Sequence, residues 1–217
     1  MASTGGTTPT QDLERQLAAR DPDVRLMLQV RDDVPGAFEV LVRRYQNRLI
    51  GVLTHLVGDP SDAEDLAQEV FLRIYRVRKG YRPQAKFSTW LFTIANNLAL
   101  NHLRSKGRRA TGSLDSGTES RPGLPAAERV AAPGGTASGQ LRQEELGDVV
   151  RKAVSTLGDD QRMAVLLNKF EDMSYAEIAT VMNRSEAAVK SLLARARMEL
   201  RSQLEPYLRS GQHPASP

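Results

Sequence analysis

The chain has 217 residues, of which 40% are hydrophobic and 5% aromatic, and its 30 basic and 26 acidic side chains leave a net charge of +4. This length corresponds to one or two small domains, and so few aromatic residues suit small helical units better than a β-sandwich core. The absence of cysteine excludes disulfides and thiolate metal sites and agrees with a reducing, intracellular setting. No apolar run approaches the roughly 18 residues of a membrane span, and the N-terminus lacks the basic-then-apolar order of a secretory signal. We therefore expect a cytoplasmic protein without membrane insertion.

The first half of the chain carries three long helical patterns within residues 12–106. After Pro35, apolar residues recur at helical spacing as far as Gly58, as in an amphipathic helix closed by glycine. Ser61 and Glu64 have the spacing of a capping box and predict the start of a second helix, DLAQEVFLRIYRV. A break at GYRPQAK separates it from a third, FSTWLFTIANNLALNHLRSK.

Helical periodicity is lost over residues 107–139, where Gly, Pro, Ser, Ala and Thr dominate. About 30 structureless residues would be unusual inside one compact domain, so this segment is interpreted as a flexible linker. Helical patterns return over residues 140–209, while the ends, 1–11 and 210–217, are interpreted as disordered tails. The predicted fold is therefore all-α, with two small helical domains, 12–106 and 140–209, on a flexible tether.

No motif in the sequence indicates catalysis. The three histidines, His55, His102 and His213, are scattered and lack metal-ligand spacing, and the chain has no Walker or dinucleotide glycine loop. The acidic residues within 59–65 lack the ligand order of a calcium loop and lie where a helix N-terminus favours carboxylates. No nucleophile–base pair can be proposed. We expect a protein that is not an enzyme and that holds no cofactor and no metal.

The segment EDMSYAEIATVMNRSEAAVKSLLARARMEL has the pattern of a helix-turn-helix. Ser174 and Glu177 form a capping box for the first helix, and Ser185 can cap the second. Asn183 lies at the turn, where a left-handed backbone is often needed and Asn tolerates it better than most residues. Apolar residues at helical spacing give each helix an inner face.

The opposite face of the second helix is small and basic. At about 100° per residue, Arg184, Ala187, Ser191, Ala194 and Arg195 point outward, flanked by Lys190, Arg197 and Arg201. An ordinary solvated helix would also carry charges there. The two caps, the turn and the basic face together favour DNA binding, with this helix in a major groove.

A polar stripe marks the third helix of the first unit. It contains, at steps of three, four and seven, Trp90, Asn97, Asn101, Arg104 and Arg108. An aromatic platform, amides and cations in this order suit unstacked bases and a phosphate backbone. Trp90 could equally be a core residue, whereas DNA contact is favoured for the basic cluster that the stripe ends in.

The helix DLAQEVFLRIY has a second face beside its core positions. Its core spacing is given by Leu66, Val70, Ile74 and Val77. The residues off that stripe could form a protein-binding face, and they are Asp65, Gln68, Glu69 and Leu72.

Taken together, DAEDLAQEVFLRIY, FSTWLFTIANNLALNHLRSKGRR and SYAEIATVMNRSEAAVKSLLARAR resemble the extracytoplasmic-function (ECF, group IV) sigma factors of bacterial RNA polymerase. The match spans residues 23–105 and 141–208 in the family's order and spacing. The resemblance implies a region 2 within 12–106 that docks on the clamp coiled coil of the polymerase largest subunit and that reads and melts the −10 element as a single strand. It implies a region 4 within 140–209 that reads the double-stranded −35 element and contacts the polymerase flap. It also implies a role in stress response and an anti-sigma factor as regulator.

The resemblance assigns roles to individual positions. Those for −10 DNA are Lys86, Phe87, Ser88, Trp90, Asn97, Asn101, Arg104, Lys106, Arg108 and Arg109. Those for −35 DNA are Arg184, Ser185, Glu186, Lys190, Ser191, Arg195 and Arg197. Those for the polymerase are Asp65, Gln68, Glu69, Phe71 and Leu72. The second helix of the helix-turn-helix departs from the family, which often has Gly-Thr at Ala187 and Ala188, Arg at Leu192 and His at Ala194.

Two other functions were weighed against a promoter-specificity subunit. One is a stand-alone helix-turn-helix regulator whose N-terminal helices bind a partner, and the other is an interaction protein such as a decoy for a regulator. The segment FSTWLFTIANNLALNHLRSKGRR argues against the stand-alone regulator, because such a protein needs no stripe that captures a single strand. We therefore expect a sigma factor.

Overall fold

The computed structural model describes the backbone of residues 9–112 and 137–210, and the side chains within 12–108 and 146–207. Every regular element in these ranges is helical, which confirms the all-α prediction. Most of the predicted linker and tails lies outside the described residues. None of the described helices is long and apolar enough to cross a membrane.

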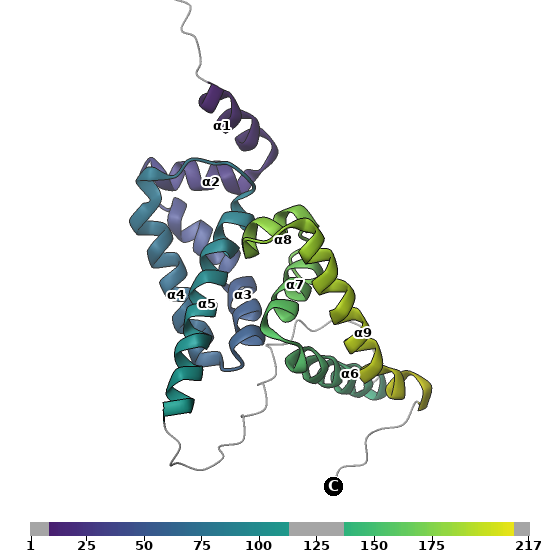
Figure 1. Ribbon diagram of the computed structural model, residues 1–217. Coiled ribbons are helices and arrows are strands. Elements are labelled where there is room, and N and C mark those ends of the chain that lie inside the picture. Colours follow the sequence, from purple (N-terminus) through teal and green to yellow (C-terminus); the bar gives the residue numbers. More distant parts are fainter. Residues whose placement is uncertain (1–8, 113–136, 211–217) are drawn as a thin grey trace, which may run out of the picture.

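The N-terminal unit is a bundle with a crossing pair of helices at one end. Its elements, in chain order, are α1 (Pro9–Arg20), α2 (Pro22–Arg31), α3 (Ala37–Val57), α4 (Pro60–Val77), the 3-10 turn η1 (Arg78–Gly80) and α5 (Phe87–Gly112). In Figure 1, α3, α4 and α5 lie alongside one another, α2 crosses their upper ends, and α1 projects beyond it. Helix α5 continues past the predicted end at residue 106 and is the longest element of the unit.

Glycine and aspartate set the ends of α3 and α4. Gly58 has a φ of 78° and donates its N–H to Thr54 O at 2.9 Å, which confirms the predicted end of α3. The predicted capping box of Ser61 and Glu64 is wrong. Asp59 caps α4 instead, and its Oδ1 accepts the N–H of Asp62 at 2.9 Å. The reason is the proline at position 60, which fits the first helical position because it has no N–H to satisfy.

Helix α3 supplies the centre of this unit's core. Leu41, Leu49 and Leu53 are fully buried, as their spacing predicts. The ring of Tyr45 lies edge-on to Phe87, with 5.1 Å between the ring centroids, and its hydroxyl donates to Asp23 Oδ2 at 2.5 Å. Burial and the adjacent carboxylate raise the pKa of Tyr45. The start of α5 is thereby packed against the middle of α3.

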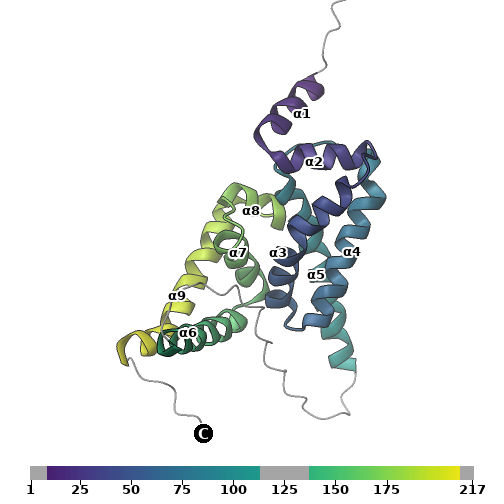
Figure 2. The same ribbon diagram turned by 180° about the vertical axis from the view of Figure 1, so that it is seen from behind.

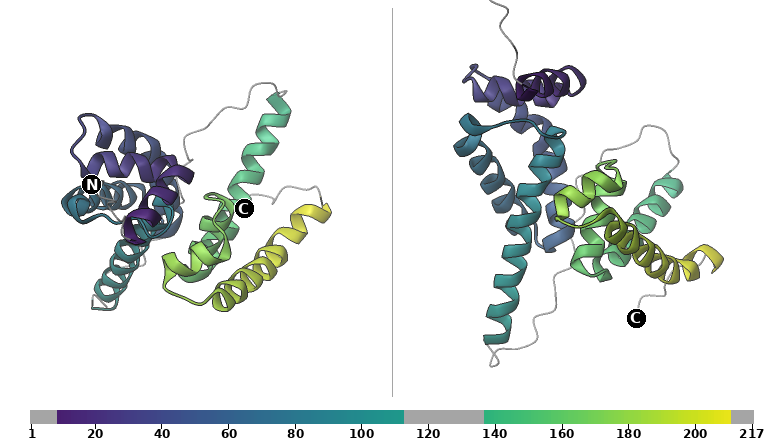
Figure 3. Two further views of the ribbon diagram at one scale, coloured as in Figure 1. Left: turned by 90° about the horizontal axis from the view of Figure 1, so that it is seen from above. Right: turned by 45° about the horizontal axis from the view of Figure 1, so that its top comes forward.

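The C-terminal unit contains the predicted helix-turn-helix on a two-helix support. Its elements are α6 (Ala137–Thr156), α7 (Asp159–Lys169), α8 (Tyr175–Met182) and α9 (Glu186–Ser210). Helix α9 contacts the three other helices of the unit, and Figure 3 shows it running the unit's full length. Helix α6 begins slightly before the predicted start of the domain at residue 140.

The two units pack against each other, although the sequence predicted only a tether between them. Helix α8 lies against α5 and α7 lies against α3, so that one apolar core extends from Val24 to Ala196 (Figures 1 and 2). The reason lies in α7, where every residue from 162 to 167 is buried. A helix without a polar face needs cover on both flanks. Helix α9 covers one flank and α3 covers the other.

A buried arginine fixes this junction. The guanidinium of Arg162 donates to Leu56 O of α3 at 2.9 Å and to Ser155 O and Leu157 O, at the end of α6, at 2.7 and 2.8 Å. Carbonyls in the last turn of a helix have no partner within the helix and carry the negative end of its dipole. One cation therefore satisfies the ends of two helices that belong to different units.

Replacement of Arg162 tests this role. We expect Arg162→Ala to lower the free energy of unfolding by about 3 kcal/mol, because it leaves several buried carbonyls without a donor. Arg162→Lys should lose less, since it keeps the charge but not the planar fork of donors. Urea denaturation of the three proteins measures both effects, and an alanine variant within experimental error of the parent would contradict this account of the junction.

Candidate nucleic-acid interface

The helix-turn-helix has the local geometry that its sequence predicts. Ser174 and Glu177 cap α8 reciprocally, because Ser174 Oγ accepts the N–H of Glu177 at 3.3 Å and Glu177 Oε2 accepts the N–H of Ser174 at 2.8 Å. Asn183 adopts the left-handed conformation at the turn, with φ 50° and ψ 52°. Ser185 Oγ accepts the N–H of Ala188 at 3.2 Å and begins α9. All three predictions are confirmed.

Helix α9 presents its small and basic residues to solvent. Its inner side is buried through Val189, Leu193 and Ala196. The residues predicted to face outward or to contact −35 DNA are all exposed, and they are Arg184, Ser185, Glu186, Ala187, Lys190, Ser191, Ala194, Arg195, Arg197 and Arg201. A cation-rich surface with little bulk at its centre can approach a groove closely.

The exposed side chain of Arg184 forms an ion pair with Asp160 of the same unit. Its Nη2 lies 2.5 Å from Oδ2 of Asp160, in the first turn of α7, where the helix dipole favours a carboxylate. A phosphate that binds Arg184 must therefore compete with this ion pair, whereas Lys190 and Arg195 form no ion pair with the described residues.

The polar stripe of α5 is exposed along most of its length. Its residues Asn97, Asn101, Arg104 and Arg108 are exposed. Of the other predicted −10 positions at this end of α5, Lys106 is exposed and the side chain of Arg109 lies outside the described residues. Lys106 binds Asp62 Oδ2 at 2.9 Å, and this ammonium is the main reason that the pKa of Asp62 is lowered.

Trp90 combines the two roles that the sequence left open. It is half-buried, and its ring centroid lies 4.8 Å from that of Tyr81 and 6.0 Å from that of Phe87. Part of the ring therefore belongs to an aromatic cluster, and the rest reaches the surface next to the stripe. Phe87 is fully buried and Ser88 is half-buried, so Phe87 supports this surface from below.

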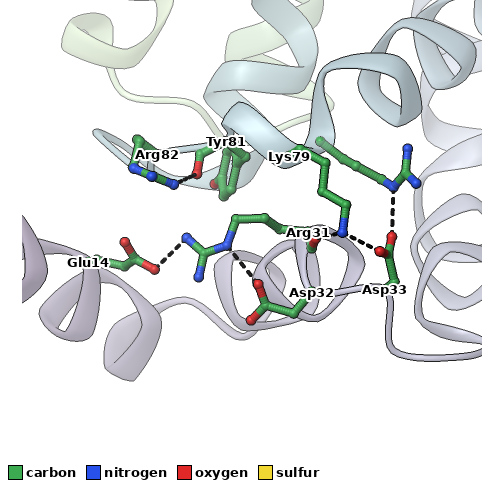
Figure 4. A network of polar contacts seen from close by, with 8 residues as sticks. Glu14, Arg31, Asp32, Asp33, Lys79, Tyr81 and Arg82 are labelled. Atoms are coloured by element: carbon green, nitrogen blue, oxygen red, sulfur yellow. Dashed lines mark hydrogen bonds and ion pairs between the residues drawn. The ribbon is translucent and has the colours of Figure 1, made fainter.

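The loop before α5 alternates between core and solvent. Tyr81 and Pro83 are buried, whereas Arg82, Gln84 and Lys86 are exposed. The break at this loop was predicted, but Arg82 and Gln84 were not among the predicted site residues, because alternation over so few residues is a weak signal. Figure 4 shows Tyr81 and Arg82 beside the polar network of α1 and α2.

The outer face of α4 is more apolar than predicted. Asp65, Gln68 and Leu72 are exposed, Glu69 is half-buried, and Phe71 is buried in the core. The core assignment of Val77 is wrong, since it is 47% exposed at the end of the helix, and Tyr75 is exposed as well. These two residues extend the predicted protein-binding face toward η1.

Polar contacts join the two units around these surfaces. Arg48 of α3 pairs with Glu171, whose side chain is almost fully buried, and Lys86 binds Glu177 Oε1 at 2.8 Å. Asn96 of α5, which is buried, donates to Val181 O of α8 at 3.4 Å. The start of α8 thus lies directly on the loop before α5.

A pocket of about 600 Å³ separates α5 from α7 and α9. Arg104 of the stripe and Arg195 of the helix-turn-helix both line it, together with Asp159 and Asp160 at the start of α7. The two predicted DNA-reading surfaces therefore meet across a single pocket in this structure.

Comparison with protein families assigns both units. Residues 41–109 match the model for sigma-70 region 2, and residues 148–200 match the model for sigma-70 region 4. The chain is 33% identical to the RNA polymerase sigma-H factor of Pseudomonas aeruginosa over 195 residues, which cover 89% of this chain and 99% of that protein. It is 32% identical to the ECF RNA polymerase sigma-E factor of Escherichia coli K12 over 189 residues, which cover 86% and 96%.

The chain belongs to the ECF family of RNA polymerase sigma factors. The resemblance noted in its motifs is confirmed, and the sigma factor therefore directs core RNA polymerase to promoters. Membership of this family argues against the two other functions that were weighed, a stand-alone regulator and a decoy.

Solved structures share the fold of this sigma factor. One is the sigma factor RpoE in complex with the anti-sigma factor NepR from Bartonella quintana, with a TM-score of 0.62 and 24% identity, covering 78% of this chain and 98% of that one. Another is CnrH in complex with the cytosolic domain of CnrY, with a TM-score of 0.59 and 22% identity, covering 86% and 99%.

A histidine between the units makes stability depend on pH. His55 of α3 stacks on Phe170 at 6.1 Å, and burial together with the cations of Arg151 and Arg162 lowers its pKa from the ordinary 6.5. Because the unfolded chain binds the proton first, the free energy of unfolding should fall as the pH drops below about 6.5 toward the lower pKa of the folded state. Denaturation of the parent and of His55→Gln at pH 7.5 and 5.5 measures this. The loss should be smaller in the variant, and an equal loss in both proteins would exclude His55 as its source.

Proposed function

We propose that this sigma factor reads a promoter with two surfaces of its own. The stripe of α5 and the loop 81–86 take the non-template −10 strand, and the outer face of α9 enters the major groove of the −35 element. Exposure of both surfaces supports the assignment, since both are basic and neither is covered by the core. The chain contributes binding alone, and it acts in the cytoplasm, where its polymerase and DNA are.

The −10 surface suits a strand that has already lost its stacking. Extrusion of a base costs about a few kcal/mol of stacking free energy. Stacking of the base on Trp90 can offset part of this cost, and the side-chain amides of Asn97 and Asn101 can form hydrogen bonds with base edges. Arg104 and Arg108 continue the same side of α5 and fit the following phosphates. Binding that favours the open strand drives melting without ATP. Arg82 and Gln84, the exposed residues of the loop, are the additional groups that can contact an extruded base.

The −35 surface combines close approach with phosphate contacts. Ala187, Ser191 and Ala194 are small and exposed, so that the backbone of α9 can lie deep in a groove. Lys190 and Arg195 flank them and reach phosphates or guanines. The departures from the family at Ala188 and Ala194, where Thr and His are often found, thus replace polar side chains with methyl groups, whereas the flanking cations of Lys190 and Arg195 are kept.

The exposed face of α4 is the proposed site for core polymerase. Asp65 and Gln68 offer polar contacts, and Leu72 and Tyr75 offer an apolar surface beside them that is 49% and 44% exposed. Phe71 acts from the core beneath this face. A regulator of the anti-sigma class is proposed to compete for these surfaces, because RpoE, which shares this fold, is bound to the anti-sigma factor NepR in its solved structure.

Promoter binding requires the two units to separate. The −10 and −35 elements lie about 25 base pairs apart, or about 85 Å along B-DNA at about 3.4 Å per pair. Arg104 and Arg195 line the same pocket, so the two surfaces lie next to each other and cannot reach both elements at once. Lys86 is also bound to Glu177 of the opposite unit. We therefore assign the packed arrangement to the sigma factor before it engages polymerase and promoter.

Transcription in vitro tests the function itself. Purified protein added to core polymerase and a promoter library should give transcripts from specific start sites. The absence of specific transcripts with an active core enzyme would contradict the proposed function. A gel shift in the absence of polymerase would then favour the stand-alone regulator.

Arg195→Ala tests the −35 surface. Loss of one cation at the groove should reduce initiation by about tenfold on a promoter that depends on its −35 element. Lys152→Ala, a charge removed from an exposed position on α6, is the matched control and should leave initiation unchanged. Equal initiation by the parent and the Arg195 variant would remove Arg195 from the contact surface.

A further inference from the structure

One carboxylate joins the starts of two helices in region 2. Asp21 precedes α2, and its Oδ1 accepts the N–H of Asp23 at 2.8 Å as a helix cap. Its second oxygen, Oδ2, accepts the N–H of Phe87, the first residue of α5, at 2.9 Å. The first N–H groups of a helix have no partner within the helix, and a carboxylate is favoured there by the dipole. Asp21 therefore serves both helices at once.

This link fixes the exit of the loop 81–86. Phe87 follows the loop directly, and its backbone position sets where Lys86 and Trp90 lie at the proposed −10 surface. Asp21 comes from a segment before residue 41, where the region 2 match begins. The helices α1 and α2 thus reach the loop from outside the matched segment.

The entrance of the loop is fixed by the same helices. Asp33, directly after α2, accepts from Arg78 Nε at 3.1 Å and pairs with Lys79, whose ammonium also donates to Arg31 O at 2.9 Å. Arg31 is in turn paired with Glu14 of α1 at 2.7 Å, as Figure 4 shows. Both ends of the loop are therefore held by acids of one segment, with Tyr81 packed between them.

These contacts leave a defined set of groups available to DNA. With Tyr81 and Pro83 held in the core, Arg82, Gln84 and Lys86 must point outward. A shift of Phe87 would move Lys86 and the ring of Trp90 together. Lys86 is the last residue of the loop, and Phe87 and Trp90 belong to the first turn of α5. Placement within a fraction of an ångström matters for a site that must favour an extruded base.

We propose that Asp21 is a positioning residue for −10 recognition, which it serves by holding the start of α5 against α2. The proposal rests on the proposed function of this surface. Asp21 touches no DNA in this account, and its effect passes through the backbone of Phe87 to the loop and to Trp90.

The chain contains a matched control. Asp59 also precedes a proline and caps its own helix, with Oδ1 accepting the N–H of Asp62 at 2.9 Å. Within the described part of the chain, its carboxylate makes no hydrogen bond to another helix. Asparagine caps a helix about as well as aspartate, so Asp59→Asn should keep its contact. Asp21→Asn offers one oxygen in place of two and must lose either the cap of α2 or the link to Phe87.

The experiment compares Asp21→Asn with Asp59→Asn in holoenzyme on a promoter whose start site has been mapped. We expect the Asp21 variant to lower the rate of open-complex formation by about tenfold, measured by permanganate reactivity of −10 thymines, with core-polymerase affinity unchanged. The Asp59 variant should match the parent in both. Equal open-complex rates for the two variants would overturn the proposal.

A second measurement separates positioning from loss of fold. Trp90 is the only tryptophan of the chain, so its fluorescence reports directly on the start of α5. Asp21→Asn should change the emission of Trp90 and its quenching by acrylamide, while the Asp59 variant keeps the parent's values. Unchanged Trp90 fluorescence in Asp21→Asn would also overturn the proposal. Failure of the proposed function would be recognised separately, because the parent holoenzyme would then form no open complex.

Discussion

The burial of α7 on both flanks is the constraint on which the arrangement of this sigma factor depends. Residues 162–167 of α7 are buried on every side of the helix, and α9 contacts only one flank of this stretch. Helix α3 of the other unit supplies the missing cover. Arg162 then donates hydrogen bonds to carbonyls of both units at the edge of the contact. These bonds fix the orientation of the two units, which apolar packing alone would not do.

The same junction determines what the DNA-reading surfaces can do. Helix α8 is carried onto α5, so Glu177 reaches Lys86 in the −10 loop while its other oxygen caps α8. The stripe of α5 and the outer face of α9 are each complete, yet they line one pocket. In the function proposed above, both surfaces are formed within their own units, and the packing of the units prevents their joint use until a partner separates them. An equilibrium of this kind responds to any ligand that binds the separated form better.

Local signals in the sequence predicted local structure well. The caps at Ser174 and Ser185 and the turn at Asn183 depend on a few neighbouring residues, and all are as predicted. Ser61 and Glu64 failed as a cap because Asp59 and its proline competed for the same helix start. Long-range features were not predictable, since periodicity does not say what covers a face. Thus the structure was needed to show the contact of α7 with α3, the exposure of Val77 and the hydrogen bond from Phe87 to Asp21.

The distance between the units is the most direct test of the proposed separation. Because the chain has no cysteine, single cysteines can be introduced at the exposed positions Arg25 of α2 and Ser202 of α9 and labelled with a donor and acceptor dye. The chain alone should give high transfer efficiency, and the open complex with core polymerase and promoter should give a distance longer by tens of ångströms, in line with the about 85 Å between the two elements. The same short distance in a transcriptionally active open complex would contradict the account.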